Sequence, residues 1–462
     1  MKRFSAVSSV VVALSLAFLF EGCASVSLDP VRFASQAADA NRDESRIEKA
    51  LHALCDKGLA EFCEKEARVL LENGKSEPAK VAAARGCLAG RNSSCATEGD
   101  ILLAQGKIPE ANQVLSGACE SKSALDGVAC PGAGEAAYQA GDPARALRLW
   151  KRGCSLGNLV ACYFEGKAAR LGNQIGASLA PLKRACEGGV LGSCSEYGIS
   201  LALDGKLEAA LDKFNSDCDR RSHRACRWAP LLEEKTKRKD LDRTLDLDCR
   251  KNNSREACYD STVLQFLRKG GRTLALYRWK ENCKAGHKMS CWESFIEENG
   301  LKPLTQMNPE LEKYCTEGIL VACYFRGLNY AEAGKRERAL PLWSDACSKG
   351  EPWSCYLASE SEALGETERA GFRAKACEIG LKRACGSPEG DAEMVVKKAK
   401  PESIDYPASC TSGDADACAY VATKKAQESP DGAQDGDAKE HFRRACLASS
   451  TLGCEGLVRA LK

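Results

Sequence analysis

Apolar residues recur at intervals of three and four along many segments of the chain. Two such runs are Ala146-Leu149-Trp150-Cys154 and Ala339-Leu342-Trp343-Ala346-Cys347. Residues spaced in this way share one face of an α-helix, whereas a half-buried strand would alternate at every second residue. The pattern therefore predicts amphipathic helices.

The residue one helical turn before a cysteine is apolar at almost every repetition of this pattern, and Arg373 is the one exception. We expect the apolar members to face the core, since residues four apart lie on the same side of a helix. They are Leu51, Ala83, Leu115, Trp150, Leu182, Phe214, Leu245, Trp279, Leu311, Trp343, Tyr406 and Phe442. Trp228, Trp292 and Trp353, close to other cysteines, are also predicted to be core residues.

The 27 cysteines resolve into one single residue, Cys23, and thirteen pairs, eleven of which enclose seven residues. The predicted disulfides are Cys55 with Cys63, Cys87 with Cys95, Cys119 with Cys130, Cys154 with Cys162, Cys186 with Cys194, Cys218 with Cys226, Cys249 with Cys258, Cys283 with Cys291, Cys315 with Cys323, Cys347 with Cys355, Cys377 with Cys385, Cys410 with Cys418, and Cys446 with Cys454. Paired cysteines could instead bind zinc, but zinc motifs commonly enclose only two to four residues. We therefore expect disulfides and no metal site.

The pairs recur with a mean period of about 32.6 residues, which indicates a solenoid. A glycine three residues after the first cysteine is suited to closing a helix there, and it occurs at Gly58, Gly90, Gly157, Gly189, Gly286, Gly318, Gly350, Gly380 and Gly413. A second series marks the other turn of each repeat, at Gly74, Gly106, Gly141, Gly172, Gly205, Gly270, Gly300, Gly334 and Gly365. The predicted fold is an all-α, α/α solenoid of about twelve disulfide-stapled helical hairpins.

The extreme N-terminus has the features of an export signal: Lys2 and Arg3, then a mostly apolar stretch over residues 6–20. The segment ending in Gly22 and Cys23 resembles a lipobox, which implies cleavage before Cys23 and attachment of lipid to its sulfur. An ordinary secreted protein cut nearby is the alternative. An oxidising compartment agrees with the predicted disulfides, and the outer membrane is the expected location, with the protein facing the periplasm or the cell surface.

These features divide the chain into five parts. We expect a signal peptide over 1–22, a lipidated N-terminus and tether over 23–45, and a regular repeat array over 46–385. An irregular loop or degenerate repeat follows over 386–409, and the C-terminal repeats over 410–462 carry a polar insertion between Lys425 and Asp437. Insertions in a solenoid often lie on its binding face, although neutral drift in an exposed turn explains them equally simply.

The cysteine-bearing turns resemble those of Sel-one-like repeats, which are related to tetratricopeptide repeats. The resemblance rests on segments such as residues 152–162 (RGCSLGNLVAC) and 317–323 (EGILVAC). Over roughly residues 45–460 the chain is most similar to the Helicobacter-type cysteine-rich proteins. This resemblance implies secreted, disulfide-bridged α/α hairpins.

Composition excludes several classes of protein. The 66 Lys and Arg nearly balance the 64 Asp and Glu, and aromatic residues make up only 6% of the chain, so nucleic acid is not an expected partner. No cofactor is expected. The histidines His52, His223, His287 and His441 lie in different repeats and are predicted to be surface residues.

Catalytic motifs are also missing from the sequence. No serine is followed by lysine three residues later and no Lys-Thr-Gly occurs, so the acylating residues of penicillin-binding proteins are absent. The acidic pairs Glu233-Glu234 and Glu297-Glu298 are interpreted as solvated helix faces. We expect a non-enzymatic scaffold that binds a protein, peptide or glycan of the cell envelope and attaches to the membrane through its lipid. The alternative is a weak hydrolase of peptidoglycan precursors or β-lactams.

Overall fold

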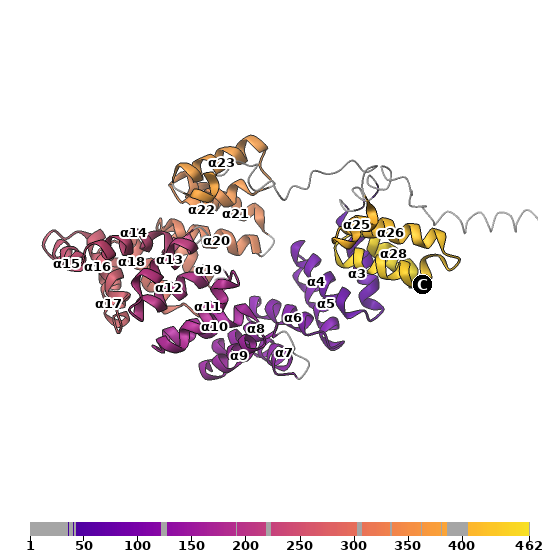
Figure 1. Ribbon diagram of the computed structural model, residues 1–462, viewed down its shortest axis with the longest axis horizontal. Helices are drawn as coiled ribbons and strands as arrows, with labels where there is room; N and C mark the ends of the chain where they lie inside the picture. The colour runs from indigo at the N-terminus through magenta and orange to yellow at the C-terminus, as the bar shows by residue number, and fades with distance from the viewer. Residues whose placement is uncertain are drawn as a thin grey trace, which may run out of the picture. The chain divides into compact units, whose positions relative to one another are not determined.

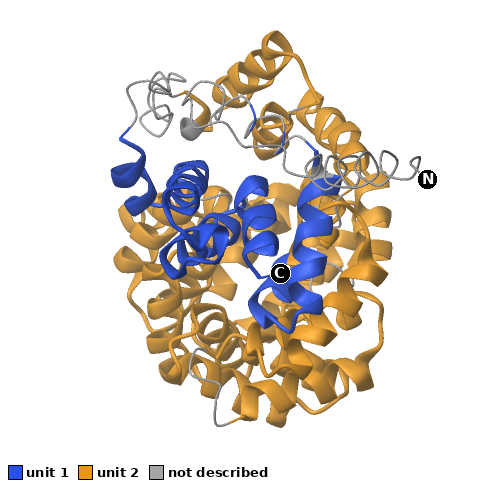
Figure 2. Cartoon of the chain, turned by 90° about the vertical axis from the view of Figure 1, so that its right-hand side faces the viewer, with its two compact units in different colours: residues 1–65, 393–462 blue, residues 66–392 orange. Residues whose placement is uncertain are grey.

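The computed structural model describes residues 36, 40, 43–121, 127–190, 192–218, 223–302, 307–332, 335–361, 363–379, 381–385 and 405–461. The predicted signal peptide, Cys23, nearly all of the tether, Gly334, Gly380 and residues 386–404 lie outside this part of the chain. Contacts between Cα atoms group the chain into two compact units (Figure 2). Unit 1 combines residues 1–65 with 393–462, and unit 2 is residues 66–392.

The described residues form helices and short turns, and no strand occurs among them (Figure 1). The α-helices and two short 3-10 helices are α3 Glu44–Asp56, α4 Ala60–Glu72, α5 Ser76–Leu88, α6 Asn92–Ala104, α7 Ile108–Glu120, α8 Cys130–Gln139, α9 Pro143–Ser155, α10 Leu159–Leu171, α11 Ile175–Glu187, α12 Ser193–Leu203, α13 Leu207–Cys218, α14 His223–Lys237, α15 Leu241–Lys251, α16 Arg255–Phe266, α17 Arg272–Lys284, α18 Lys288–Glu298, α19 Asn308–Thr316, α20 Leu320–Glu332, α21 Arg336–Ser348, α22 Pro352–Ser359, α23 Glu366–Glu378, η2 Lys382–Cys385, α25 Tyr406–Thr411, α26 Ala415–Glu428, η5 Gly432–Gln434, α27 Gly436–Leu447 and α28 Thr451–Ala460. The prediction of an all-α array of hairpins is confirmed.

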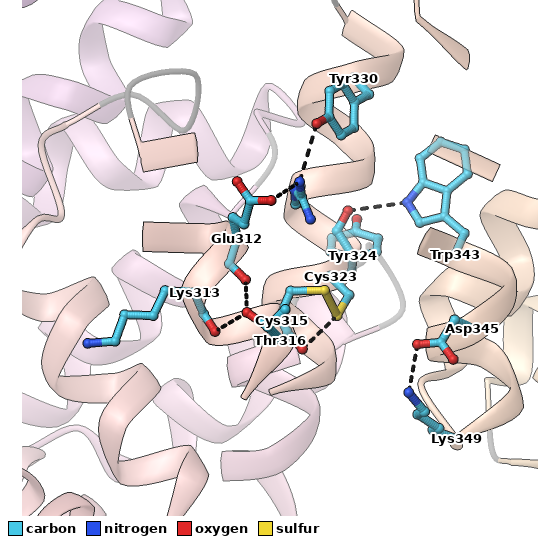
Figure 3. The surroundings of a disulfide bond; sticks show 11 residues. Glu312, Lys313, Cys315, Thr316, Cys323, Tyr324, Tyr330, Trp343, Asp345 and Lys349 are labelled. Atoms are coloured by element: carbon cyan, nitrogen blue, oxygen red, sulfur yellow. Dashed lines mark hydrogen bonds and ion pairs between the residues drawn. A yellow bond between two sulfur atoms is a disulfide. The ribbon is translucent and has the colours of Figure 1, made fainter. Parts of the chain in front are cut away.

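Thirteen disulfides link the end of one helix to the start of the next along the chain. Their Cα–Cα distances run from 4.4 to 4.8 Å. Figure 3 shows one of them, Cys315–Cys323, which joins α19 to α20. Closing so short a loop removes unfolded-state entropy worth about 2 to 3 kcal/mol per bond in the chain-entropy model. Each bond therefore fixes the angle at which two neighbouring hairpins meet.

The turn inside each disulfide loop follows one recurring design. After α9, the Gly157 amide donates to the Cys154 carbonyl and the Asn158 amide donates to the Gly153 carbonyl, each at 3.0 Å. This pair of bonds closes the helix and requires a left-handed residue, which Gly157 supplies with φ of 94°. The Asn158 side chain then accepts from the Ala161 amide at 3.0 Å and caps α10.

The glycine prediction is confirmed at every described position three residues after a first cysteine, because all these glycines have positive φ. The described members of the second series also lie in turns between helices, as predicted, but they do not share one backbone conformation. Gly172 has φ of −79° and the next residue, Asn173, takes the left-handed conformation with φ of 62°. Gly365 has φ of −64° and precedes α23 instead of ending a helix.

The predicted core position is also confirmed. Eleven of the twelve residues one turn before a cysteine are buried, and Leu245 is half-buried against the same core. Arg373, which breaks the apolar series, reaches outward and donates to Glu360 Oε1 at 2.7 Å. Trp228, Trp292 and Trp353 are buried as predicted.

Two tryptophans show how these core residues dock on the preceding helix. The indole nitrogen of Trp150 donates to the Pro131 carbonyl at 3.1 Å, and that of Trp343 donates to the Tyr324 carbonyl at 3.2 Å (Figure 3). Both accepting residues directly follow the second cysteine of a pair. Gly134 on α8 lies against the Trp150 ring, and a Cβ there would overlap that ring. The close approach of α8 and α9 therefore depends on this glycine.

Gly134→Ala tests this packing. We expect a loss of about 1 to 3 kcal/mol in stability, because the added methyl group forces Trp150 out of its position. Gly117→Ala is the matched control, since no other heavy atom would come within 4 Å of its Cβ. That variant should gain about 0.5 to 1 kcal/mol in stability, because alanine gives the unfolded chain less backbone entropy than glycine does. Thermal unfolding followed by circular dichroism measures both, and equal effects of the two would contradict the packing argument.

Candidate functional site

Charged side chains from five helices of unit 2 meet in one place, which we name the buried charge cluster. Its members are Lys167 and Arg170 on α10, Glu196 on α12, Arg224 on α14, Arg272 on α17, and Glu293 and Glu297 on α18. The side chains of Arg170, Glu293 and Glu297 are each only 1% exposed. Charged groups are rarely buried this completely unless they are paired.

Arg170 is the centre of the buried charge cluster. Its Nε donates to Glu196 Oε2 at 2.7 Å, and its Nη1 and Nη2 donate to the two oxygens of Glu297 at 2.9 and 3.2 Å. Lys167 Nζ lies 3.4 Å from Glu196 Oε1 and donates to the Tyr163 hydroxyl at 2.9 Å. A two-pronged guanidinium–carboxylate pair of this kind fixes orientation as well as charge. Arg170 therefore fixes the position of α18 against α10.

The other half of the cluster joins α14 to α16 and α18. Arg224 Nε donates to Glu293 Oε2 at 2.9 Å, and its guanidinium carbon lies 4.9 Å from the centre of the Trp228 ring. The Tyr259 hydroxyl donates to Glu293 Oε1 at 3.2 Å and accepts from the Trp228 indole at 3.0 Å. These polar atoms thus have partners, whereas Arg224 Nη2 lies 2.7 Å from Glu293 Oε2 without hydrogen-bond geometry.

The pKa shifts agree with this pairing. Burial alone would raise the pKa of Glu297, but the charge and hydrogen bonds of Arg170, together with Arg224, lower it to about 2. Burial opposes the ionised form of Glu196 too, yet Arg170 and Lys167 lower its pKa. Both carboxylates are therefore ionised at neutral pH, and their role is structural pairing instead of proton transfer.

The buried charge cluster limits where a ligand can bind. Arg170 and Glu297 are 127 residues apart in sequence, so α10 and α18 converge although three hairpins separate them. Their inward side chains are buried against one another. A peptide therefore has no open groove between α10 and α18 at this level of unit 2.

Two sequence interpretations are wrong here. The sequence pattern places Glu297 on a solvated face, but the residue is buried because α18 turns it toward Arg170, while its neighbour Glu298 is exposed and pairs with Lys280. His287 is predicted at the surface, but its side chain is only 12% exposed. It occupies the capping position that Asn158 has in another turn, and its Nδ1 accepts from the Ser290 amide at 3.2 Å.

Two other sequence interpretations are confirmed, the solvated Glu233-Glu234 pair and the surface position of His52. Glu233 and Glu234 lie on an exposed face and pair with Lys237 and Arg238 one turn later. The His52 side chain is 57% exposed. Among the described residues, no group of three or more His, Cys, Asp or Glu side chains could hold a metal ion. Within that same part of the chain, no helix has the length and hydropathy of a membrane span.

Asp100 on α6 and Glu135 on α8 form a second feature that sequence reasoning did not single out. Asp100 is an exposed residue by its accessible surface, and desolvation by the neighbouring helices raises its pKa to about 6. Burial, and then the charge of Asp100, raise the pKa of Glu135 to about 7. Carboxyl groups with pKa values near neutrality can exchange protons at physiological pH.

Two clefts open at the turn side of unit 2. One of about 620 Å³ is lined by turns that include Asn173, Asp204 and Lys269. The other, of about 450 Å³, is lined mainly by charged residues on and beside α15. Arg268 borders both clefts and bonds to Asp242. Both clefts are open to solvent, so a partner can reach the residues that line them.

Arg170→Met tests the buried charge cluster. We expect the opening free energy of α10 and α18 to fall by about 3 to 5 kcal/mol, because Glu196 and Glu297 lose their principal partner while remaining buried. Hydrogen exchange of both helices measures it.

The exposed Arg148→Met on α9 is the matched control and should stay within about 0.5 kcal/mol of the parent. Adding Glu297→Gln to Arg170→Met should recover part of the loss, since it neutralises a buried carboxylate that has lost its two-pronged partner and keeps only Arg272 within hydrogen-bond distance. A loss no larger than that of the control would show that the cluster does not fix these helices.

No protein-family model matches the sequence, and no curated protein matches it. Similar solved structures include a protective antigen of uropathogenic Escherichia coli strains that displays an SLR fold. It is 14% identical, the match covers 94% of this chain and 97% of that chain, and the TM-score is 0.33. A chain of the APC/C hetero-tetramer Cut9–Hcn1 is 11% identical over 89% of this chain and 99% of its own length, with a TM-score of 0.27.

The TPR domain of P58(IPK) is 14% identical over 85% of this chain and 100% of its own length, with a TM-score of 0.21. The helices and disulfides of the chain itself establish the architecture. The described chain is thus an array of disulfide-linked helical hairpins.

Proposed function

We propose that the chain is an extracytoplasmic scaffold that binds a protein, peptide or cell-wall glycan of the envelope through its helical-repeat surface. The observation that carries this proposal is the stacking of successive hairpins. Helices α6, α8, α10 and α12 contact one another in order, as do α7 and α9 on the other layer. Stacked repeats create extended surfaces on which several side chains can contact one partner.

Export and lipid anchoring are part of the same proposal. The many disulfides of the described residues favour an oxidising compartment, and the sequence around Cys23 favours attachment of lipid at the outer membrane. The protein would then face the periplasm or the cell surface.

Intact mass before and after reduction tests export and anchoring. We expect the mature protein to begin at Cys23, to carry lipid there, and to accept twenty-six alkyl groups only after reduction. Peptide mapping should then recover the thirteen adjacent pairs. Free thiols without reduction, or retention of residues 1–22, would contradict the extracytoplasmic location.

Partner capture tests the scaffold. The purified chain, with its disulfides intact, is cross-linked in envelope extracts, and retained protein and glycan are identified. Because the buried charge cluster fills the space between α10 and α18, we expect contacts at the two clefts that Arg268 borders. Arg268→Ala should weaken capture several-fold, whereas Arg148→Ala on the exposed side of α9 should not.

A hydrolase is the competing function, and the raised pKa values of Asp100 and Glu135 are the observation that favours it. The scaffold proposal predicts no turnover of a chromogenic β-lactam or of peptidoglycan fragments. Turnover that is lost in Asp100→Asn and Glu135→Gln would replace the scaffold by this alternative. The scaffold proposal would also be contradicted if the intact chain captured no partner in larger amount than a reduced and alkylated sample of the same chain.

A further inference from the structure

The first disulfide-linked pair of helices, α3 and α4, packs against the last such pair, α27 and α28, although most of the sequence lies between them. Both belong to unit 1, in which α3 contacts α28. Elsewhere in the array, the second helix of a disulfide pair is covered by the helix that follows it along the chain, as α6 is by α7 and α10 is by α11. The helix that covers α28 is instead α3, from the other end of the described chain. We name this contact the end joint.

The apolar part of the end joint resembles an ordinary contact between repeats. Leu51 on α3 occupies the core position one turn before a first cysteine and is completely buried. Leu457 and Ala460 on α28 are 3% and 1% exposed. The terminal repeat of a solenoid normally needs a polar outer face to remain soluble. Here α28 has apolar residues that another helix buries.

Polar contacts give the end joint its specificity. Arg46 donates through Nε and Nη2 to the two oxygens of Glu455, each at 2.8 Å. Arg443 Nε donates to Glu61 Oε1 at 2.7 Å. Lys65 Nζ donates to the Leu447 carbonyl at 2.7 Å, at the C-terminus of α27, where a cation is favoured by the unpaired carbonyl groups.

The end joint differs from comparable contacts in its covalent structure. The contacts of α6 with α7 and of α10 with α11 have no disulfide either, but a short turn of backbone joins the two helices of each. Helices α28 and α3 are not consecutive in the chain, and none of the thirteen described disulfides joins them, so the contact has neither link. Cys55–Cys63 fixes α3 to α4, and Cys446–Cys454 fixes α27 to α28. Each side is therefore rigid by itself, while the contact between them is held by apolar packing and partly exposed ion pairs, and is reversible.

We propose that the end joint is an exchangeable interface. Through it, the helix pair α3 and α4 of one copy packs against the helix pair α27 and α28 of a second copy. The two faces are complementary in charge and shape because they already pair within one chain. An element that is bound non-covalently within a chain can be exchanged between two copies at little cost, since the same contacts form again. This inference goes beyond the proposed function and does not depend on export.

Two charge reversals in the full chain make the exchange observable. In Arg46→Glu the new carboxylate faces the carboxylate of Glu455, and in Glu455→Arg the new guanidinium faces that of Arg46. In each variant on its own, α3 and α28 of the same copy therefore repel each other. When the two variants are mixed, each end joint between unlike copies places a carboxylate opposite a guanidinium, and both contacts are attractive. We expect each variant alone to be monomeric and the mixture to form a dimer, measured by size-exclusion chromatography with light scattering.

The double variant Arg46→Glu/Glu455→Arg restores the pair within one chain, so it should be monomeric and folded. Hydrogen exchange of α3 should quicken by about tenfold or more in each single variant and return to the parent rate in the double variant. Lys425→Glu, which breaks the ion pair with Asp437 in the same unit, should leave α3 unchanged. A mixture that stays monomeric while the double variant is folded overturns the proposal.

Discussion

The disulfide that closes each turn between hairpins is the constraint on which the rest of the structure depends. Alanine is the most frequent residue in the buried core of the described chain. Small side chains bury little apolar area, so each interface gains little from the hydrophobic effect. A bond that holds two helix ends within 4.8 Å of each other compensates by removing conformations from the unfolded chain. The frequent disulfides therefore compensate for the small apolar area that each interface buries.

The glycines that face large core residues lie on helix pairs that no disulfide links directly. Helix α8 meets Trp150 of α9 at Gly134, and α20 meets Trp343 of α21 at Gly327, where a Cβ has no room. The turns that do carry a disulfide follow one design, in which a left-handed residue ends one helix and the next residue caps the following helix. His287 is such a cap, and its burial follows from the turn and not from any chemistry of its ring.

The repeated part of this architecture was predictable from sequence because it depends on residues close together in the chain. Helices, paired cysteines and core positions all follow from spacings of three to eleven residues. The buried charge cluster was not predictable in this way, since Arg170 meets Glu297 only after several hairpins have stacked with a particular rotation between them. The only signal was the presence of charged residues on helices that otherwise face inward. Glu297 and Glu298 look alike in sequence, and the rotation of α18 alone distinguishes them.

The end joint was also not predictable from the sequence, because its two helices lie at opposite ends of the described chain. Its consequence concerns assembly. An open solenoid has two unlike ends, and a heterologous contact between such ends either closes within one chain or continues from copy to copy. The same atoms touch whether the contact forms within one chain or between two copies. Which case occurs therefore depends on the difference in free energy between the closed chain and the assembly of copies. Ion pairs as exposed as Arg46 with Glu455 contribute little to stability but strongly favour correct partners. Successive helices of the array are thus joined by a turn of backbone and, at every second junction, by a disulfide as well. Its assembly depends on the contact between α28 and α3, which has neither.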